Sequence, residues 1–238
     1  MSPRLELPVE GRALPRSEHL ARVLLLLFWC AVATDLICLA AGQSLGHTLA
    51  KPLLLPLLAA HAWVRGAPRL LVVALLLGFG GDALLLFDAD VAFLAGMGSF
   101  AAGHVCYLVL FRRYGTPQAR GAWIVGAYGI GLVALVVSLW PGLPAGLRIP
   151  VAGYSLLLTA MACRATRLGP VAGVGGALFL LSDTLIATGI AEWPQLPGPD
   201  VWVMSTYVVA QFLLARGILE RRQAQAATTH PEVPSATG

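Results

Sequence analysis

The stretch "LLLGFGGDALLLFDAD", residues 75–90, decides the fold class, because it places an acid, Asp82, inside an apolar run. About a hundred residues later, "ALFLLSDTLIATG" (177–189) places Asp183 in a similar setting. A charged carboxylate at the centre of a membrane helix costs about 2.5–3.5 kcal/mol on insertion scales. Such residues normally face the interior of a helix bundle and have a function there.

The composition around these two acids is that of a membrane protein. Of the 238 residues, 58% are hydrophobic and 12% are charged, and that charged fraction is about half of what a soluble domain carries. Apolar runs of about 17–22 residues recur along the chain, each long enough to cross a bilayer core of roughly 30 Å. The net charge of +4 therefore reports membrane topology and does not indicate binding of nucleic acid. The four cysteines lie in apolar runs without CxxC spacing, so they predict neither a disulfide framework nor a metal site.

The predicted fold is an all-α, polytopic bundle of eight transmembrane helices. The first apolar run is longer than the apolar core of a signal peptide and contains Asp35, so we expect it to be a retained helix. We expect one transmembrane domain over 22–219, between a polar tail at 1–21 and a disordered tail at 220–238. The spanning segments are predicted at 22–41, 50–64, 69–87, 91–112, 121–140, 148–164, 170–190 and 201–219.

The basic residues predict that both termini are cytoplasmic. With eight spans and a cytoplasmic N-terminus, the outer segments hold only Lys51 and Arg148, a strong positive-inside bias. In this topology Asp35, Asp82 and Asp183 each lie thirteen residues after the inner start of their helix. At 1.5 Å per residue, this places each acid roughly 20 Å from the inner end of its helix, in the outer half of the membrane. The fourteen inner basic residues are Arg4, Arg12, Arg16, Arg22, Arg65, Arg69, Arg112, Arg113, Arg120, Arg164, Arg167, Arg216, Arg221 and Arg222.

Asp82 and Asp183 form a candidate catalytic pair. Two carboxylates that face each other in a low dielectric cannot both ionise, so one acid is expected to hold a proton beside one carboxylate. Such a pair can act as a general acid and a general base. The alternative is that both acids only hydrogen-bond neighbouring helices, and for Asp35 the structural and functional interpretations are equally supported.

Further polar residues lie at helical spacing in other predicted spans. In "FLAGMGSFAAGHVCYLVLF" (93–111), His104 and Tyr107 share a face with small and aromatic residues. Tyr207 and Gln211 lie one turn apart in the last span, and a buried Gln in a membrane needs a partner. Tyr154 fits either a site or the membrane interface.

The order of these motifs resembles the YhhN family over residues 50–215. One departure is Val208, where the family commonly has a second tyrosine, and Asp35 lies outside the family pattern. The residues that carry the resemblance are Lys51-Pro52, Gly81-Asp82, Leu84-Leu85, Phe93, Gly96, Phe100, His104, Tyr107, Gly176-Ala177, Ser182-Asp183, Tyr207 and Ala210-Gln211.

The YhhN family comprises eight-helix membrane proteins and includes the animal lysoplasmalogenases. The resemblance implies hydrolysis of the vinyl-ether bond of a lysoplasmalogen to a fatty aldehyde and a glycerophospho-alcohol. No cofactor or metal is expected, and the partners are a lysophospholipid substrate and membrane lipids. The predicted substrate-binding residues are Lys51, His104, Tyr107, Tyr154, Ser182, Tyr207 and Gln211, beside the catalytic Asp82 and Asp183.

Lys51 lies at the predicted outer end of its span, where its ammonium could meet a lipid phosphate or reach the interface. We therefore expect substrate to enter from the outer leaflet, and we expect the membrane to be a bacterial cytoplasmic membrane. One alternative is a zinc hydrolase that uses His104 with the two acids. The others are a proton- or cation-coupled transporter and a lipid-binding scaffold with purely structural acids.

Overall fold

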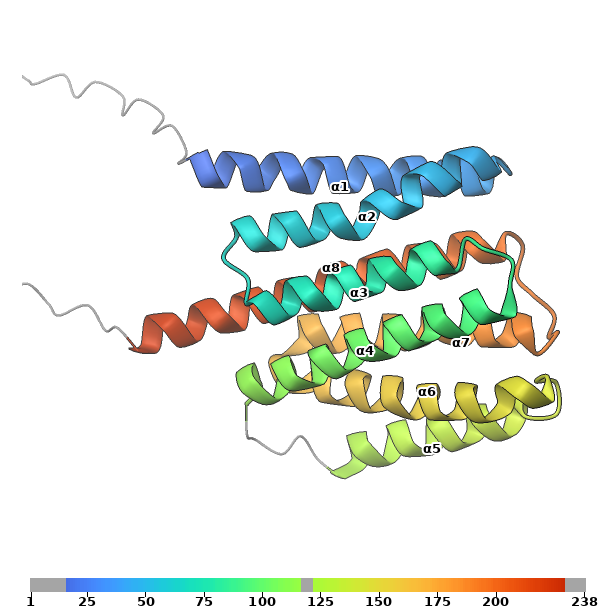
Figure 1. The fold of residues 1–238 in the computed structure, drawn as a ribbon. Coiled ribbons are helices and arrows are strands. Elements are labelled where there is room, and N and C mark those ends of the chain that lie inside the picture. Colours follow the sequence, from blue (N-terminus) through green and yellow to red (C-terminus); the bar gives the residue numbers. More distant parts are fainter. Residues whose placement is uncertain (1–15, 117–121, 230–238) are drawn as a thin grey trace, which may run out of the picture.

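The computed structural model describes residues 16–116 and 122–229, which form eight α-helices and one 3-10 turn. The helices run along one common axis as a single bundle (Figure 1). Their bounds are α1 Arg16–Ala40, α2 Ser44–Val64, α3 Arg69–Leu84, α4 Asp90–Tyr114, α5 Ala122–Leu139, α6 Ala145–Ala165, η1 Thr166–Leu168, α7 Pro170–Ile190 and α8 Pro199–Thr229.

The predicted all-helical fold is confirmed. Six helices, namely α1, α4, α5, α6 with η1, α7 and α8, are long and apolar enough to cross a membrane. Of the other two, α3 has only 16 residues, which is about 24 Å of helix, and α2 carries Lys51 and two histidines. Both pack lengthwise in the bundle, α2 against α1 and α3 (Figure 1).

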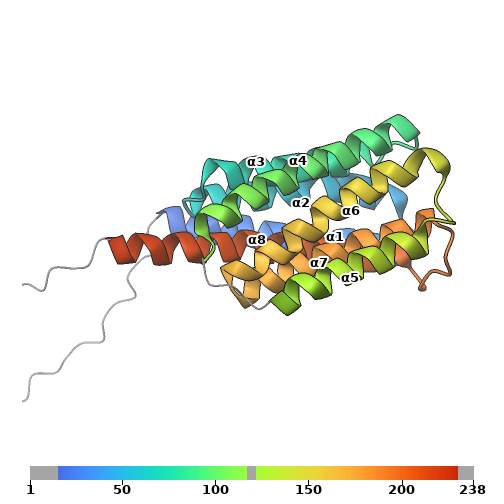
Figure 2. The same ribbon diagram turned by 90° about the horizontal axis from the view of Figure 1, so that it is seen from below.

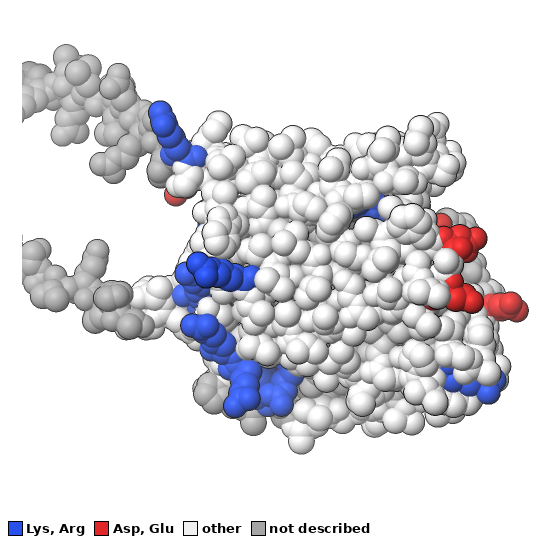
Figure 3. Space-filling view, in the orientation of Figure 1, with Lys and Arg blue, Asp and Glu red and all other residues white. Residues whose placement is uncertain are grey.

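Both described chain ends lie at the same end of the bundle (Figure 1), which agrees with a predicted even number of spans. Most visible Lys and Arg side chains gather at that end, and most visible Asp and Glu side chains lie at the opposite end (Figure 3). The gathering of Lys and Arg at one end is what the positive-inside rule predicts for a cytoplasmic end. The assignment of the basic end to the cytoplasm stays a prediction, and Arg4, Arg12 and Arg120 lie outside the described residues.

The last helix is longer than predicted. α8 continues to Thr229 and projects beyond the other helices (Figures 1 and 2), so residues 220–229 are helical and not a disordered tail. An i,i+4 pair, Arg216 to Glu220 at 2.6 Å, joins this stretch to the preceding turn of the helix. α1 likewise begins at Arg16 and not at the predicted residue 22, so residues 16–21 are helical and not part of a tail. The predictions for residues 1–15 and 230–238 fall outside the described residues.

Glycines bring α7 close to its neighbours. A Cβ on Gly176 would lie 2.9 Å from Cα of Ala162 in α6, and one on Gly175 would lie 3.0 Å from the backbone nitrogen of Leu214 in α8. Small residues of this kind let membrane helices approach closely. α7 is thus packed between α6 and α8, and this fixes the position of Asp183.

Candidate active site

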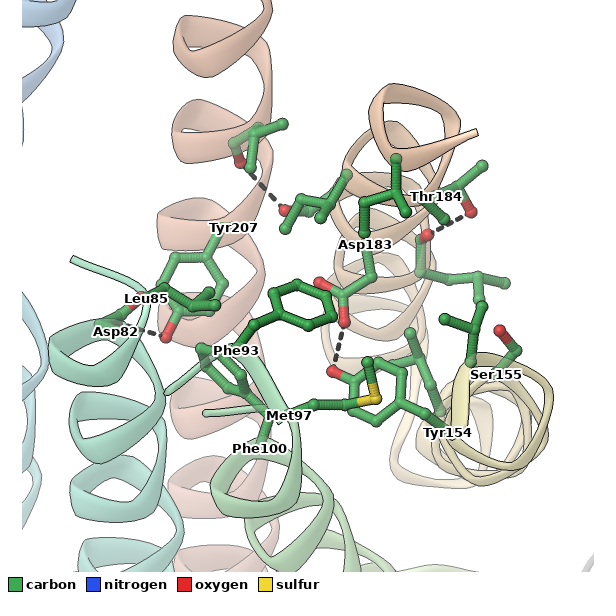
Figure 4. Close-up of a pocket in the computed structure, with 18 of the residues that line it drawn as sticks. Asp82, Leu85, Phe93, Met97, Phe100, Tyr154, Ser155, Asp183, Thr184 and Tyr207 are labelled. Atoms are coloured by element: carbon green, nitrogen blue, oxygen red, sulfur yellow. Dashed lines mark hydrogen bonds between the residues drawn. The ribbon is translucent and has the colours of Figure 1, made fainter. Parts of the chain in front are cut away.

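One pocket contains both predicted catalytic acids. Asp82 comes from the last turns of α3, and Asp183 comes from α7. Apart from these acids and a few other polar groups, the wall is apolar and comes mainly from α4, α6, α7 and α8 (Figure 4). The apolar and aromatic lining residues include Leu85, Phe93, Met97, Phe100, Leu135, Val151, Leu158 and Met204.

Asp82 has two polar partners and is only 3% exposed. Its Oδ2 accepts a hydrogen bond of 2.8 Å from the hydroxyl of Tyr207 (Figure 4). Its Oδ1 lies 3.9 Å from Nζ of Lys51, whose side chain is 11% exposed. Lys51 therefore lies in the pocket wall, with its ammonium beside a buried carboxylate.

A hydrogen-bonded chain lies behind Tyr207. The Tyr107 hydroxyl donates to Oε1 of Gln211 at 2.7 Å, and Nε2 of Gln211 donates to the Tyr207 hydroxyl at a longer 3.4 Å. Every donor in this chain points toward Asp82. The chain links α4 to α8 and then to α3, so it holds Tyr207 in place to donate to the acid.

Asp183 has a similar but shorter chain. The Tyr154 hydroxyl donates to Oδ2 of Asp183 (Figure 4), and Nε2 of His104 lies 3.0 Å from the same hydroxyl. A tyrosine hydroxyl has one proton, so Tyr154 must accept from His104, which assigns the imidazole proton to Nε2. Among the described residues, Nδ1 of His104 is buried and has no partner.

The structure divides the nine predicted site residues into two groups. Six of them line the pocket, and for these the predicted catalytic or substrate contacts stay predictions. The other three are each 1% exposed and lie behind the pocket tyrosines, a position from which they act through Tyr154 and Tyr207. The six are Lys51, Asp82, Tyr154, Ser182, Asp183 and Tyr207; the three are His104, Tyr107 and Gln211.

Sequence reasoning missed most of the apolar wall. Phe93 and Phe100 lie in the family motif, and both line the pocket with Met97. In the view of Figure 4, Phe93 lies between the two acids. An apolar residue in an apolar run carries no signal of its own, so the motif pointed to Phe93 and Phe100 and nothing in the sequence pointed to Met97.

The third membrane acid has a different environment. Oδ1 of Asp35 lies 2.8 Å from Nδ1 of His47, which belongs to α2 because that helix begins at Ser44 and not at the predicted residue 50. Asp35 does not line the pocket, and its Oδ2 is buried without a partner in the described part of the chain.

The proposed zinc ligands do not form a metal-binding group. Within residues 16–116 and 122–229, no three His, Cys, Asp or Glu side chains come together in a way that could hold a metal ion. His104 contacts Tyr154 and reaches Asp183 only through that hydroxyl. The zinc alternative therefore has no support from the arrangement of its own ligands.

Fold and site together define an eight-helix membrane protein with two acids in one apolar pocket. The chain belongs to the YhhN family, whose model matches residues 46–218, so the resemblance found in the sequence is confirmed.

Curated relatives carry the names of enzymes. The human protein named lysoplasmalogenase TMEM86B is 35% identical over 166 residues, which cover 68% of this chain and 70% of that protein. Its pig counterpart is 37% identical over 61% of each chain. A Mycobacterium tuberculosis protein named lysoplasmalogenase is 35% identical over 65% of this chain and 62% of its own length. The chain thus spans less than two thirds of the pig and mycobacterial relatives, and no solved structure matches it.

Proposed function

We propose that this protein is a membrane-embedded lysoplasmalogenase, which hydrolyses the vinyl-ether bond of a lysoplasmalogen to a fatty aldehyde and a glycerophospho-alcohol. The observation that carries the proposal is that Asp82 and Asp183, from two different helices, line one otherwise apolar pocket. The names of the relatives support the same substrate class.

The chemistry of the bond suits two carboxyl groups. A vinyl ether is hydrolysed by protonation at the carbon that does not bear oxygen, which creates an oxocarbenium ion. One carboxylic acid can deliver that proton, and one carboxylate can stabilise the cation and take a proton from the attacking water. Neither step needs a metal or a redox group.

The pocket wall suits the rest of the substrate. Its apolar and aromatic side chains can hold the alkenyl chain of a lysolipid, as ligand pockets generally do. The predicted contact of the lipid phosphate with Lys51 and entry from the outer leaflet belong to this proposal. Labelling of engineered cysteines beside Lys51 and Asp82 from each side of the membrane tests them, and access only from the basic end of the bundle would contradict outer-leaflet entry.

The test is aldehyde release by purified protein in detergent. The substrates are a lysoplasmalogen and, as controls, lysolipids with the same head group but a saturated ether or an ester at the same position. We expect aldehyde only from the lysoplasmalogen. Asp82→Asn and Asp183→Asn keep the size and polarity of the acids but cannot exchange the proton, so each should lose activity by about 10²–10⁴-fold while the protein stays folded.

Other outcomes identify the alternatives. No aldehyde from the wild-type protein, or unchanged release from both variants, would contradict the proposal. Proton-driven uptake by vesicles without lipid cleavage would favour a transporter, for which acids inside the membrane are also typical.

A further inference from the structure

We infer that the two acids have fixed and different roles: Asp183 is the proton donor, and Asp82 is the ionised partner, with Lys51 as its counter-charge. This inference rests on the proposed function. It depends on the different partners that the structure provides at the two carboxyl groups.

Hydrogen bonding alone does not distinguish the acids. Each accepts one hydrogen bond from a tyrosine, and each tyrosine accepts one from a neutral side chain behind it. The two chains are therefore matched in donor direction. Any difference in protonation between the two acids must therefore come from the surroundings of the remaining oxygen of each carboxyl group.

At Asp82 that oxygen faces a cation. Nζ of Lys51 lies 3.9 Å from Oδ1, and a neighbouring positive charge favours the ionised form of an acid. The distance is that of an ion pair and not of a direct hydrogen bond. The Oδ1 lone pairs therefore remain available to take a proton from water.

At Asp183 the remaining oxygen has no charged partner. In the described ranges, no Lys, Arg or His lies within 4.0 Å of this carboxyl group, and Tyr154 is its hydrogen-bonding partner. In Figure 4 its second oxygen points away from Tyr154, and Asp183 lines the pocket. An acid held among apolar side chains without a counter-charge favours the neutral form, and its proton then lies on the oxygen that is free to reach substrate.

These assignments give a balanced reaction. Asp183 transfers its proton to the second carbon of the alkenyl chain, and the carbon that bears oxygen becomes an oxocarbenium centre. Water adds to that centre while Asp82 takes one of the water protons, which leaves a hemiacetal, a neutral Asp82 and an ionised Asp183. The hemiacetal then collapses: Asp183 takes the hydroxyl proton, the bond from carbon to the glycerol oxygen breaks, and Asp82 returns its proton to that oxygen.

Both acids end in the state in which they began, and one water is consumed. Lys51 stays charged throughout, and in these proton transfers it acts through Asp82, so for the chemistry it is a positioning residue beside its proposed contact with the lipid phosphate. This role explains why Lys51 lies in the pocket wall and not at the surface, since its side chain is 11% exposed.

Infrared spectroscopy of the resting protein tests the assignment without relying on activity. A protonated carboxyl group has a C=O stretch that ionised carboxylates lack and that shifts in D₂O. We expect Asp183→Asn to lose such a band and Asp82→Asn to keep it. Asp35→Asn serves as the control that identifies any band from the third membrane acid.

A Lys51→Met variant keeps both acids and provides a second test if an Asn variant does not fold. Asp82 would lose its counter-charge, so the protonated-carboxyl signal should grow. An unchanged signal in Lys51→Met, or a band that Asp82→Asn removes and Asp183→Asn keeps, would overturn the inference.

Deuterium exchange then connects the assignment to the reaction. In D₂O, Asp82→Asn should still protonate the alkenyl carbon but capture water slowly, so unreacted lysoplasmalogen gains deuterium there. Asp183→Asn should introduce none, and the reverse pattern would overturn the roles. Failure of the wild-type protein to release aldehyde would instead contradict the proposed function, while the infrared result would still decide which acid is protonated.

Discussion

Replacing Tyr207 by Phe removes one hydroxyl and leaves the ring in place. The ring packs edge-on against Phe100 and Phe179, with centroids 6.0 Å and 5.4 Å away, and Phe can keep both contacts. The hydroxyl donates to Oδ2 of Asp82 at 2.8 Å, and it accepts from Gln211. The substitution therefore tests the hydrogen bond to the acid separately from packing.

The size of the effect follows from the kind of bond that is lost. A hydrogen bond to a charged group contributes about 1.5–3 kcal/mol. If this contribution holds the carboxylate where it stabilises the cation, its loss lowers kcat/KM by about 10- to 150-fold, since each 1.36 kcal/mol is tenfold in rate. The assay is aldehyde release from lysoplasmalogen, with a thermal melt of each variant in the same detergent.

Tyr114→Phe is the matched control. Tyr114 is also buried, but it lies at the far end of α4, outside the pocket. We expect this variant to keep wild-type activity. If folded Tyr207→Phe also stays within about threefold of wild type, a difference of less than about 1 kcal/mol, the hydrogen bond to Asp82 does not support catalysis and the reasoning is refuted.

Three further predictions concern other parts of the bundle. A Cβ on Gly78 would come too close to two side chains, lying 2.6 Å from Cδ1 of Leu55 and 3.1 Å from Nε2 of Gln211. Gly78→Ala should therefore destabilise the protein by about 1–3 kcal/mol and lower aldehyde release. Gly98→Ala, which meets nothing within 4 Å, should do neither; equal melting temperatures for the two variants would contradict this packing argument. Asp35→Asn should lose less than about tenfold in rate, because Asp35 lies outside the pocket, and a loss as large as that of Asp82→Asn would place it in the mechanism. Dialysis against a chelator should leave aldehyde release unchanged, because the proposed steps use only carboxyl groups; a loss restored by zinc would revive the metal alternative.

Much of the fold could be predicted because the physical constraints were strong. Long apolar runs have few alternatives to membrane helices, and the uneven distribution of arginine predicted that both termini share a side. The ends of helices were harder to place. The polar surface of α8 beyond residue 219 resembles a tail in composition, yet the helix continues there to Thr229.

The two acids could be predicted as a pair because a carboxylate in an apolar run is costly, and this cost makes Asp82 and Asp183 conspicuous in the sequence. Their partners could not be predicted in the same way. The bond from Tyr154 to Asp183 and the ion pair of Lys51 with Asp82 join residues from different helices. Which helices face each other is decided by packing, such as the close approach at Gly176, and no local pattern reports it.

His104 illustrates the same limit. Its spacing with Tyr107 correctly predicts a shared helix face, and both residues are buried in α4. The two side chains nevertheless belong to different chains of hydrogen bonds, one that leads to Asp183 and one that leads to Asp82. Only the positions of α6 and α8 separate these two roles.

The most direct test of the central claim is to run the reaction of the wild-type protein with lysoplasmalogen in D₂O and to trap the product at once as its alcohol. Protonation of the alkenyl carbon by an enzyme acid predicts a fatty alcohol with a single deuterium on the carbon next to the former carbonyl. It also predicts that Asp82→Asn and Asp183→Asn form little of this product. A product without that deuterium, or no aldehyde at all, would contradict the account.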